Sequence, residues 1–166
     1  MTPDVMPGSN MKDPYFKLRP GIPTPDDELC KCEEVSELYL AYKLGNNPVH
    51  CLRCNGEVLP EKLAFEERLA EAIASWNSVY GSLYQLWLDS GEYEEWARDR
   101  LLDPKGEVNS RGMEIVKELS ALFRTYYLWF DEAGEATQTT CPICDRELVR
   151  KEGSRFLACE SCLLII

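Results

Sequence analysis

The longest regular pattern of apolar and polar positions lies between residues 61 and 89. Its apolar residues recur every three or four positions, the spacing that places side chains on one face of an α-helix. Pro60 precedes the stretch and Ser90-Gly91 follows it, as is typical where helices begin and end. We predict a helix over residues 61–89 with a buried stripe formed by Leu69, Ile73, Trp76, Tyr80, Leu83 and Trp87.

Two shorter segments continue the helical pattern. Residues 93–102 carry apolar side chains among many charges, and the Asp103-Pro104-Lys105-Gly106 sequence ends them. Ser110 is suited to cap a third helix, because its hydroxyl can accept a bond from a free backbone N–H of the first turn. The apolar stripe predicted for this helix is Ile115, Leu119, Leu122 and Tyr126.

Short aromatic and β-branched runs predict strands on both sides of the helices. Residues 38–42 form one strand before the turn at Gly45-Asn46-Asn47-Pro48, and a second strand begins at about residue 126 and could pair with it. Residues 146–151 and 155–158 form a hairpin around Glu152-Gly153-Ser154, and residues 163–166 form a last apolar strand.

These elements predict an α+β protein with four segments. Residues 1–27 hold six of the ten prolines and are expected to be an arm that Tyr15 and Phe16 could pin to the body. Residues 28–60 contain one strand and a cysteine knuckle, and residues 61–135 contain a helical core of about three helices. Residues 136–166 form a C-terminal ribbon.

Eight cysteines in four close pairs carry the candidate chemistry. The two thiolates of a Cys-x-x-Cys turn can reach one ion, and a second pair from a distant hairpin completes a four-sulfur site. Cys141 and Cys144 are separated by fourteen residues from Cys159 and Cys162, close to the spacing of a zinc ribbon. We predict a Cys₄ zinc site from these four residues.

The N-terminal cysteines are less regular. Cys30 and Cys32 have one residue between them, and eighteen residues separate them from Cys51 and Cys54. The second pair is a good knuckle that needs two more ligands, so we predict a second Cys₄ site and two Zn²⁺ per chain. His50 is an alternative ligand, and crossed pairing of the four cysteine pairs is the nearest rival to local sites.

Two other uses of these cysteines remain open. Disulfides need an oxidising compartment, and the Met-Thr-Pro-Asp-Val start has no apolar segment typical of an export signal, so a cytoplasmic location is expected. Iron can occupy a four-thiolate site of the same spacing, although zinc suits a ribbon better.

Charge restricts the classes of partner. The net charge is −11, and residues 57–135 alone hold 17 acids and 8 bases. Nucleic acid is bound mainly through cations, so the neutral segment 136–166 is the expected contact surface. No apolar run reaches the length of a membrane helix, so no membrane partner is expected.

Several motifs follow one another over about residues 37–165: Leu38-Tyr39-Leu40, Asn47-Pro48-Val49-His50-Cys51-x-x-Cys54, Val58-Leu59-Pro60, Ile73-Ala74-Ser75-Trp76-x₃-Tyr80, Tyr126-Tyr127-Leu128, Cys141-Pro-x-Cys144 and Phe156…Cys159-x-x-Cys162-x-Leu164. Their order resembles a bacterial family described only as Zn-ribbon-containing proteins with a suggested nucleic-acid-binding role. Cys30 and Cys32 lie outside the resemblance, and Asp145 stands where the family has glycine. The resemblance implies a class of protein and no mechanism.

Catalysis is not expected, because four thiolates leave zinc without an open position and the chain has one histidine and no phosphate-binding loop. We predict a non-catalytic zinc-binding module whose candidate contacts to single-stranded nucleic acid are Arg146, Arg150, Lys151, Arg155 and Phe156. A zinc-stapled adaptor that binds a basic protein partner is the alternative, because the body is acidic. A thiolate-iron electron-transfer protein is the third possibility.

The stripe Trp76, Tyr80, Tyr84 and Trp87 is expected in the core rather than stacked on bases.

Overall fold

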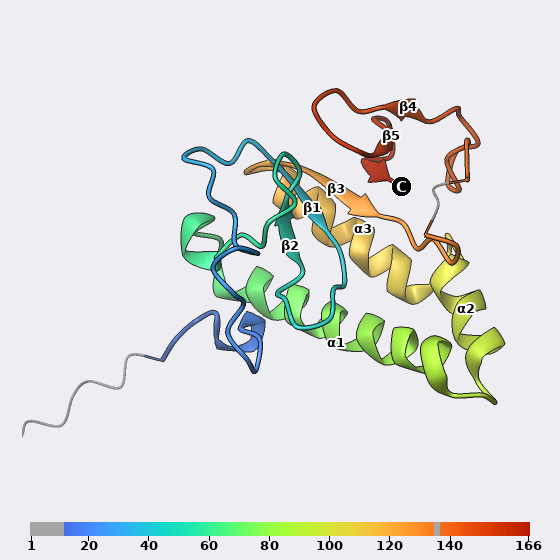
Figure 1. Cartoon of the computed structure of the whole chain (residues 1–166), viewed down its shortest axis with the longest axis horizontal. Coiled ribbons are helices and arrows are strands. Elements are labelled where there is room, and N and C mark those ends of the chain that lie inside the picture. The colour runs from blue at the N-terminus through green and yellow to red at the C-terminus, as the bar shows by residue number, and fades with distance from the viewer. Residues whose placement is uncertain (1–11, 135–136) are drawn as a thin grey trace, which may run out of the picture.

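The computed structural model describes residues 12–134 and 137–166, and within them it confirms the predicted α+β class with three α-helices and a six-stranded sheet (Figure 1). The helices are α1 (Glu67–Asp89), α2 (Glu94–Leu102) and α3 (Glu107–Ser120), with short 3₁₀ helices at Phe16–Leu18 and Pro60–Lys62. The strands are β1 (Glu37–Leu40), β2 (Val49–Cys51), β3 (Arg124–Leu128), β4 (Val149–Arg150), β5 (Leu157–Cys159) and β6 (Leu164–Ile165).

One sheet runs through the whole described molecule in the order β2-β1-β3-β6-β5-β4. Its three central strands, β1, β3 and β6, are parallel to one another, and the outer pairs are antiparallel. The predicted pairing of residues 38–42 with the strand near residue 126 is confirmed, since Tyr39 lies opposite Tyr126. The predicted hairpin is also confirmed, with Val149 opposite Ala158. The sheet therefore joins the N-terminal knuckle, the strand after the helices and the ribbon.

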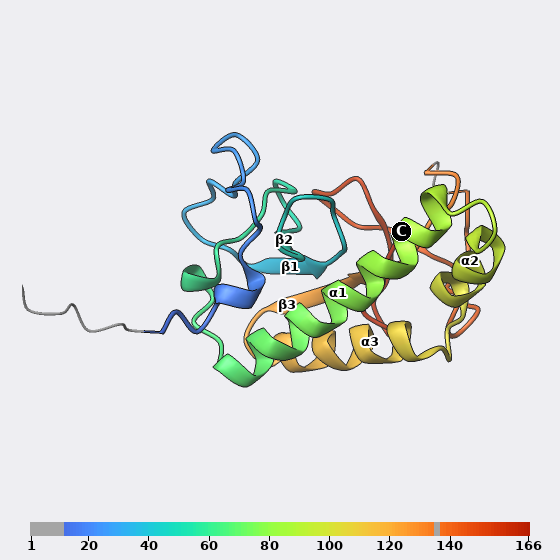
Figure 2. The ribbon, with the colours of Figure 1, turned by 90° about the horizontal axis from the view of Figure 1, so that it is seen from below.

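Both faces of the central strands are buried, as is usual for parallel strands. Helices α1 and α3 pack side by side against β1 and β3 (Figures 1 and 2). The helix-facing core includes Leu38, Leu40, Tyr127 and Leu164, together with Trp76 and Tyr80 of α1. The core position expected for Trp76 and Tyr80 is thereby confirmed.

The opposite face of the sheet has a smaller core of its own. Its buried members are Tyr39, Ala41, Leu52, Tyr126, Phe156, Ala158 and Ile165. These residues alternate along the strands with those of the helix-facing core, because successive side chains of a strand point to opposite faces. The ribbon and the N-terminal knuckle thus share a core.

The first helix begins six residues later than predicted. Pro60–Lys62 forms a separate 3₁₀ turn, and Ala64 has a φ of 49°. A residue in the left-handed region cannot continue a right-handed helix, so the chain reverses before Glu67. The apolar pattern of the sequence does not reveal this break, because Leu63 before it and Leu69 after it are both buried.

The third helix begins before the predicted cap and ends sooner. Gly106 precedes its first residue, and Ser110 lies inside the helix. The side chain of Asn109 donates to the carbonyls of Leu101 and Asp103, which ties the start of α3 to the end of α2. At the other end, Leu122 is 56% exposed and lies outside the helix.

The segment 28–60 contains two strands rather than the one predicted. Val49–Cys51 pairs with β1, and Leu40 lies opposite Val49. Three residues are too few to display an alternating pattern, and all three are buried, so the strand was not visible in the sequence.

Only part of the predicted arm is described, because residues 1–11 lie outside the described residues. In the remainder, the Tyr15 hydroxyl donates to the Phe65 carbonyl at 3.1 Å, and the two rings meet edge to face. Of the two residues expected to pin this segment, Tyr15 does so and Phe16, which is 74% exposed, does not. Leu18 is also buried in the core, and Lys17 pairs with Glu71 of α1. Within the described residues, no helix is both long and apolar enough to cross a membrane.

Candidate metal centres

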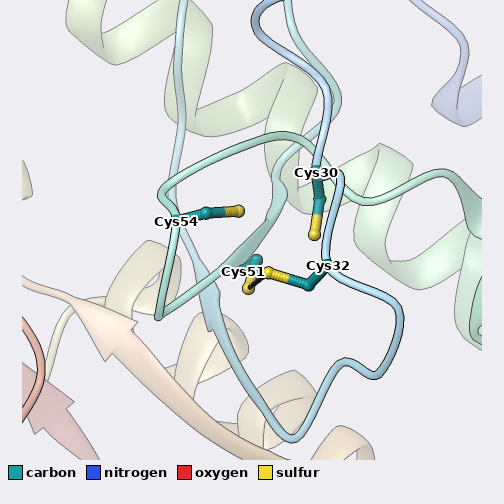
Figure 3. Close-up of side chains that lie close together, drawn as sticks. All are labelled: Cys30, Cys32, Cys51 and Cys54. Atoms are coloured by element: carbon teal, nitrogen blue, oxygen red, sulfur yellow. Dashed lines mark hydrogen bonds between the residues drawn. The ribbon is translucent and has the colours of Figure 1, made fainter.

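The eight cysteines form two groups of four, each assembled from the pairs predicted to close locally. Cys30, Cys32, Cys51 and Cys54 form site 1, and Cys141, Cys144, Cys159 and Cys162 form site 2. Within each site the four sulfur atoms lie within 4.8 Å of one another, and each group could hold one metal ion. Figure 3 shows the four thiols of site 1 directed into the space between two chain segments.

The two Cys-x-x-Cys segments have the same backbone hydrogen bonds. In site 1 the N–H of Cys51 donates to the carbonyl of Gly56 and the N–H of Asn55 donates to Cys51, both at 2.9 Å. In site 2 the equivalent bonds join Cys141 to Arg146 at 2.8 Å and Asp145 to Cys141 at 2.9 Å. Both are therefore the same tight knuckle.

A left-handed residue follows the second cysteine of each knuckle. Asn55 has a φ of 61° and Asp145 a φ of 60°. Asn and Asp adopt this conformation more readily than other residues with a side chain. Both knuckles therefore turn without a glycine at this position.

Backbone pairing brings the remaining ligands of site 1 to its knuckle. The N–H of Cys30 donates to the carbonyl of Glu57 at 2.8 Å, and the N–H of Glu57 donates to the carbonyl of Glu28 at 2.9 Å. Residues 28–30 thus run alongside the chain that leaves the knuckle. The Lys62 ammonium donates to the Cys30 carbonyl, which holds this segment from the other side.

The sheet supplies the second half of site 2. Cys159 ends β5 opposite Leu164, and Cys162 lies in the turn between β5 and β6. Leu163, immediately after it, has a φ of 52°, so the chain reverses there and enters β6. The two sites therefore lie toward opposite ends of one sheet, with Cys51 on β2 and Cys159 on β5.

The spacing of the sulfur atoms fits a bound ion. Four thiolates at about 2.3 Å from a tetrahedral metal lie about 3.8 Å from one another. The Cys32–Cys51 sulfur distance is 4.0 Å and the Cys144–Cys159 distance is 3.6 Å. These values also exceed an S–S bond, and all eight thiols are free.

Backbone donors favour the thiolate form at the second cysteine of each knuckle. The N–H of Arg146 lowers the pKa of Cys144 to about 7. At Cys54 burial acts in the opposite direction, but the N–H of Gly56 and the neighbouring thiols give a lowered pKa. Burial raises the pKa of Cys30 to about 12, so this thiol would lose its proton readily only to a metal.

His50 is not a member of either group of candidate ligands. Its ring is 1% exposed and packs edge to face on Tyr39 at 5.3 Å. Its Nδ1 atom is buried and has no hydrogen-bond partner among the described residues. The alternative in which His50 replaces a cysteine is therefore wrong for the described geometry.

The five candidate nucleic-acid contacts are not equally available. Phe156 is 5% exposed, with its ring against Tyr39, so it offers no face for a base and its expected stacking role is wrong. Arg146 donates to the Ser161 hydroxyl. Arg150 and Arg155 are exposed and form no ion pair within the described residues.

Lys151 binds other side chains of the same molecule. Its ammonium donates to the Tyr126 hydroxyl at 2.7 Å and lies 2.9 Å from Glu37 and 3.1 Å from Glu160. Although burial opposes it, these acceptors raise the pKa of Lys151 above its usual value. Lys151 therefore ties the ribbon to β1 and β3 instead of facing a phosphate.

Sequence reasoning missed the polar residues that hold site 1. The Glu57 carboxylate is 3% exposed and accepts bonds from Thr24, Asn46 and the side chain and backbone of Asn47. A single glutamate beside a glycine carries no recognisable signal in the sequence. Its function depends on partners that only the fold brings to it.

Comparison of this chain with protein-family models, with curated proteins and with solved structures finds no match.

Proposed function

We propose that this chain is a non-catalytic zinc-binding module in which one Zn(Cys)₄ site stabilises each of the two ends of the sheet. The observation that carries this proposal is the assembly of two four-sulfur groups from local cysteine pairs. Four thiolates complete the shell of a tetrahedral zinc and leave no position for substrate, so both ions stabilise structure. Iron in the same sites is the electron-transfer alternative.

Metal analysis tests this part of the proposal. Purified protein should contain two zinc ions per chain and show no visible absorption from iron bound to thiolate. The double variant Cys30→Ser with Cys32→Ser should keep one zinc, because site 2 shares no ligand with site 1. One zinc in the wild type, or stoichiometric iron, would contradict the proposal.

We infer that the partner of the module is a basic protein. A hollow of about 380 Å³ on the helical body is lined by Leu86, Tyr93 and Trp96, and the last two are about half exposed. Glu92, Glu94 and Glu95 flank Tyr93 and Trp96 in the sequence, and the Arg100 guanidinium lies over the Trp96 ring, 5.1 Å from its centre. An apolar hollow on an acidic segment suits a partner segment with an apolar anchor and flanking Lys or Arg residues.

Affinity purification with matched variants tests this partner class. Immobilised wild-type protein should retain proteins of basic sequence in a salt-sensitive manner, and Trp96→Ala should abolish their retention. Leu122→Ala is the control, since Leu122 is equally exposed but does not line the hollow. Equal retention by both variants would reject the hollow as the docking surface.

Single-stranded nucleic acid is the second candidate partner, favoured by the unpaired Arg150 and Arg155 of the hairpin. With Arg146, at most about three phosphates can be neutralised, which gives a salt slope of about −2 on single strands. We expect weak, salt-sensitive binding without tight duplex recognition, because the acidic body repels the polymer. Titration of labelled single-stranded and duplex oligonucleotides at two salt concentrations tests it, and absence of binding at low salt would remove this candidate.

A further inference from the structure

A polar cleft of about 490 Å³ lies where the N-terminal knuckle meets the ribbon hairpin. Lys43 and His50 line it from the N-terminal segment, and Arg155 lines it from the loop before β5. More than one hundred residues separate Lys43 from Arg155 in the sequence, and the shared sheet brings them to one cleft. The cleft is thus made by the fold rather than by a local motif.

Two cations, Lys43 and Arg155, line the cleft. Lys43 is half-buried, and its ammonium donates to the Tyr39 hydroxyl at 2.6 Å and to the Asn55 carbonyl at 3.5 Å. The Arg155 guanidinium lies over the Phe156 ring, 5.0 Å from its centre. Neither side chain forms an ion pair with a described residue. Burial, together with the charge of Arg155, lowers the pKa of Lys43 to about 8.

An exposed lysine needs no partner, but a half-buried one beside an arginine is costly unless an anion joins them. The wall of the cleft carries a second incomplete feature, since the buried Nδ1 of His50 has no hydrogen-bond partner among the described residues. A buried polar atom without a partner costs about 1–3 kcal/mol. The half-buried charge of Lys43 beside Arg155 indicates a cleft suited to an anion.

Acidic groups in the same cleft limit the size of that ligand. Asp27 and Glu28 line it together with Lys31 and Cys54, and the charge of Glu28 acts on Lys43. Glu57 also lines the cleft, but Thr24, Asn46 and Asn47 already donate to its carboxylate. A long polyanion would meet more of these carboxylates than one phosphate group between Lys43 and Arg155 would.

We propose that this cleft binds a single phosphate group between the Lys43 ammonium and the Arg155 guanidinium. Arginine offers paired N–H donors that match phosphate oxygens, and lysine contributes a compact positive charge. The phosphate can come from the end of an oligonucleotide or from a free phosphate compound. The site goes beyond the proposed protein partner, whose hollow on α1 and α2 shares no residue with it.

Calorimetric titration of the zinc-loaded protein with inorganic phosphate tests the site. We expect binding in the millimolar range at low salt, weakened about tenfold in Arg155→Gln and in Lys43→Met, the change expected for loss of one charge-assisted hydrogen bond. Arg150→Gln is the matched control, because Arg150 is exposed on the same hairpin and does not line the cleft. Its affinity for phosphate should stay within about twofold of the wild type.

Two oligonucleotides identify the source of the phosphate. A trinucleotide with a 5′-phosphate should bind more tightly than the same trinucleotide with a 5′-hydroxyl if the cleft holds a terminal phosphate; if only inorganic phosphate binds, the ligand is a free phosphate compound. Absence of phosphate binding, or equal weakening by Arg150→Gln and Arg155→Gln, would overturn the proposal and leave any nucleic-acid contact to the hairpin surface. Unchanged metal content in every variant shows that the fold is intact, and Trp96→Ala should bind phosphate as the wild type does.

Discussion

At the scale of single residues, site 1 depends on a glycine that carries no ligand atom. A Cβ atom built on Gly56 would lie 2.6 Å from the backbone nitrogen of Cys30 and 2.8 Å from its Cα atom. Both of these atoms belong to the backbone, so they cannot move aside as the end of a flexible side chain would. The missing side chain lets the Cys30 segment approach the Cys51 knuckle.

We therefore expect Gly56→Ala to lose the metal of site 1 and keep that of site 2. Elemental analysis should return one zinc per chain instead of two. Gly21→Ala is the control, because a Cβ there meets nothing within 4 Å and the residue has an ordinary backbone conformation. Two zinc ions in Gly56→Ala with unchanged resistance to a chelator would show that the close approach is unimportant.

Lys43 gives the protein a specific dependence of stability on pH. Its folded-state pKa of about 8 lies below the ordinary value of 10.5, with burial as the main cause, Arg155 adding to it and Glu28 opposing it. Between these values the folded protein has released the proton and the unfolded chain still holds it. The free energy of unfolding therefore rises with pH across this window, and the full cost of the buried charge is present below about pH 8.

Comparison with Lys43→Met isolates this contribution. From pH 8 to 10.5 the free energy of unfolding of the wild type should rise relative to that of the variant. The rise should be about 1–2 kcal/mol, because solvent screens the charge of a half-buried group. Denaturant titration at each pH measures the difference. A constant difference across the window would mean that Lys43 titrates normally in the folded protein.

At the scale of elements, Asn109 fixes how α2 meets α3 and how both meet the sheet. Its amide donates to the carbonyls of Leu101 and Asp103, and its oxygen accepts the Tyr127 hydroxyl at 2.8 Å. One turn away, Gly112 leaves room for the Tyr127 ring, because a Cβ there would lie 2.2 Å from it. The start of α3 is thus set by buried contacts and not by a capping hydroxyl.

Asn109→Asp should destabilise the protein by about 2–4 kcal/mol, because a carboxylate would face two carbonyl oxygens to which it cannot donate. Chemical denaturation followed by tryptophan fluorescence measures the loss. Ser110→Ala distinguishes this arrangement from a Ser110 cap: a change within about 0.5 kcal/mol agrees with the structure, and a loss of about 1 kcal/mol would indicate a cap.

At the scale of the whole molecule, the ribbon is part of the central sheet. β6 lies between β3 and β5, and its Leu164 and Ile165 are fully buried. The N–H of Tyr127 donates to the Leu163 carbonyl at 2.7 Å and that of Trp129 donates to Ile165 at 2.9 Å. Disruption of site 2 would therefore weaken the hydrogen bonds between β6 and the chain of β3.

Cys159→Ser should lose one zinc and unfold the ribbon while the helices persist, because α1 and α3 pack on each other and on β1 and β3. Structural zinc supplies on the order of 10–16 kcal/mol of apparent binding free energy, which a small ribbon cannot replace with its own core. Hydrogen exchange should show lost protection at the amides of Tyr127 and Trp129. Retained protection there, or loss of the helical circular dichroism signal, would contradict this coupling.

The sequence alone predicted how the cysteines group into two candidate metal sites, the presence of three helices and the strand pairing of the hairpin. Cysteines with one or two residues between them can reach one ion, and a stripe such as Ile73, Trp76 and Tyr80 follows from helix geometry alone. These signals are local, so they need no knowledge of distant contacts.

Only the tertiary structure decided which ribbon residues are available and where the ribbon lies. Lys151 reaches Tyr126 across 25 residues of sequence, and Phe156 packs on Tyr39, so neither faces a ligand. The same holds for the position of β6 beside β3 and for the cleft that joins Lys43 to Arg155. Charge and aromatic character are visible in the sequence, but burial and ion pairing are set by whichever distant residues the sheet places beside them.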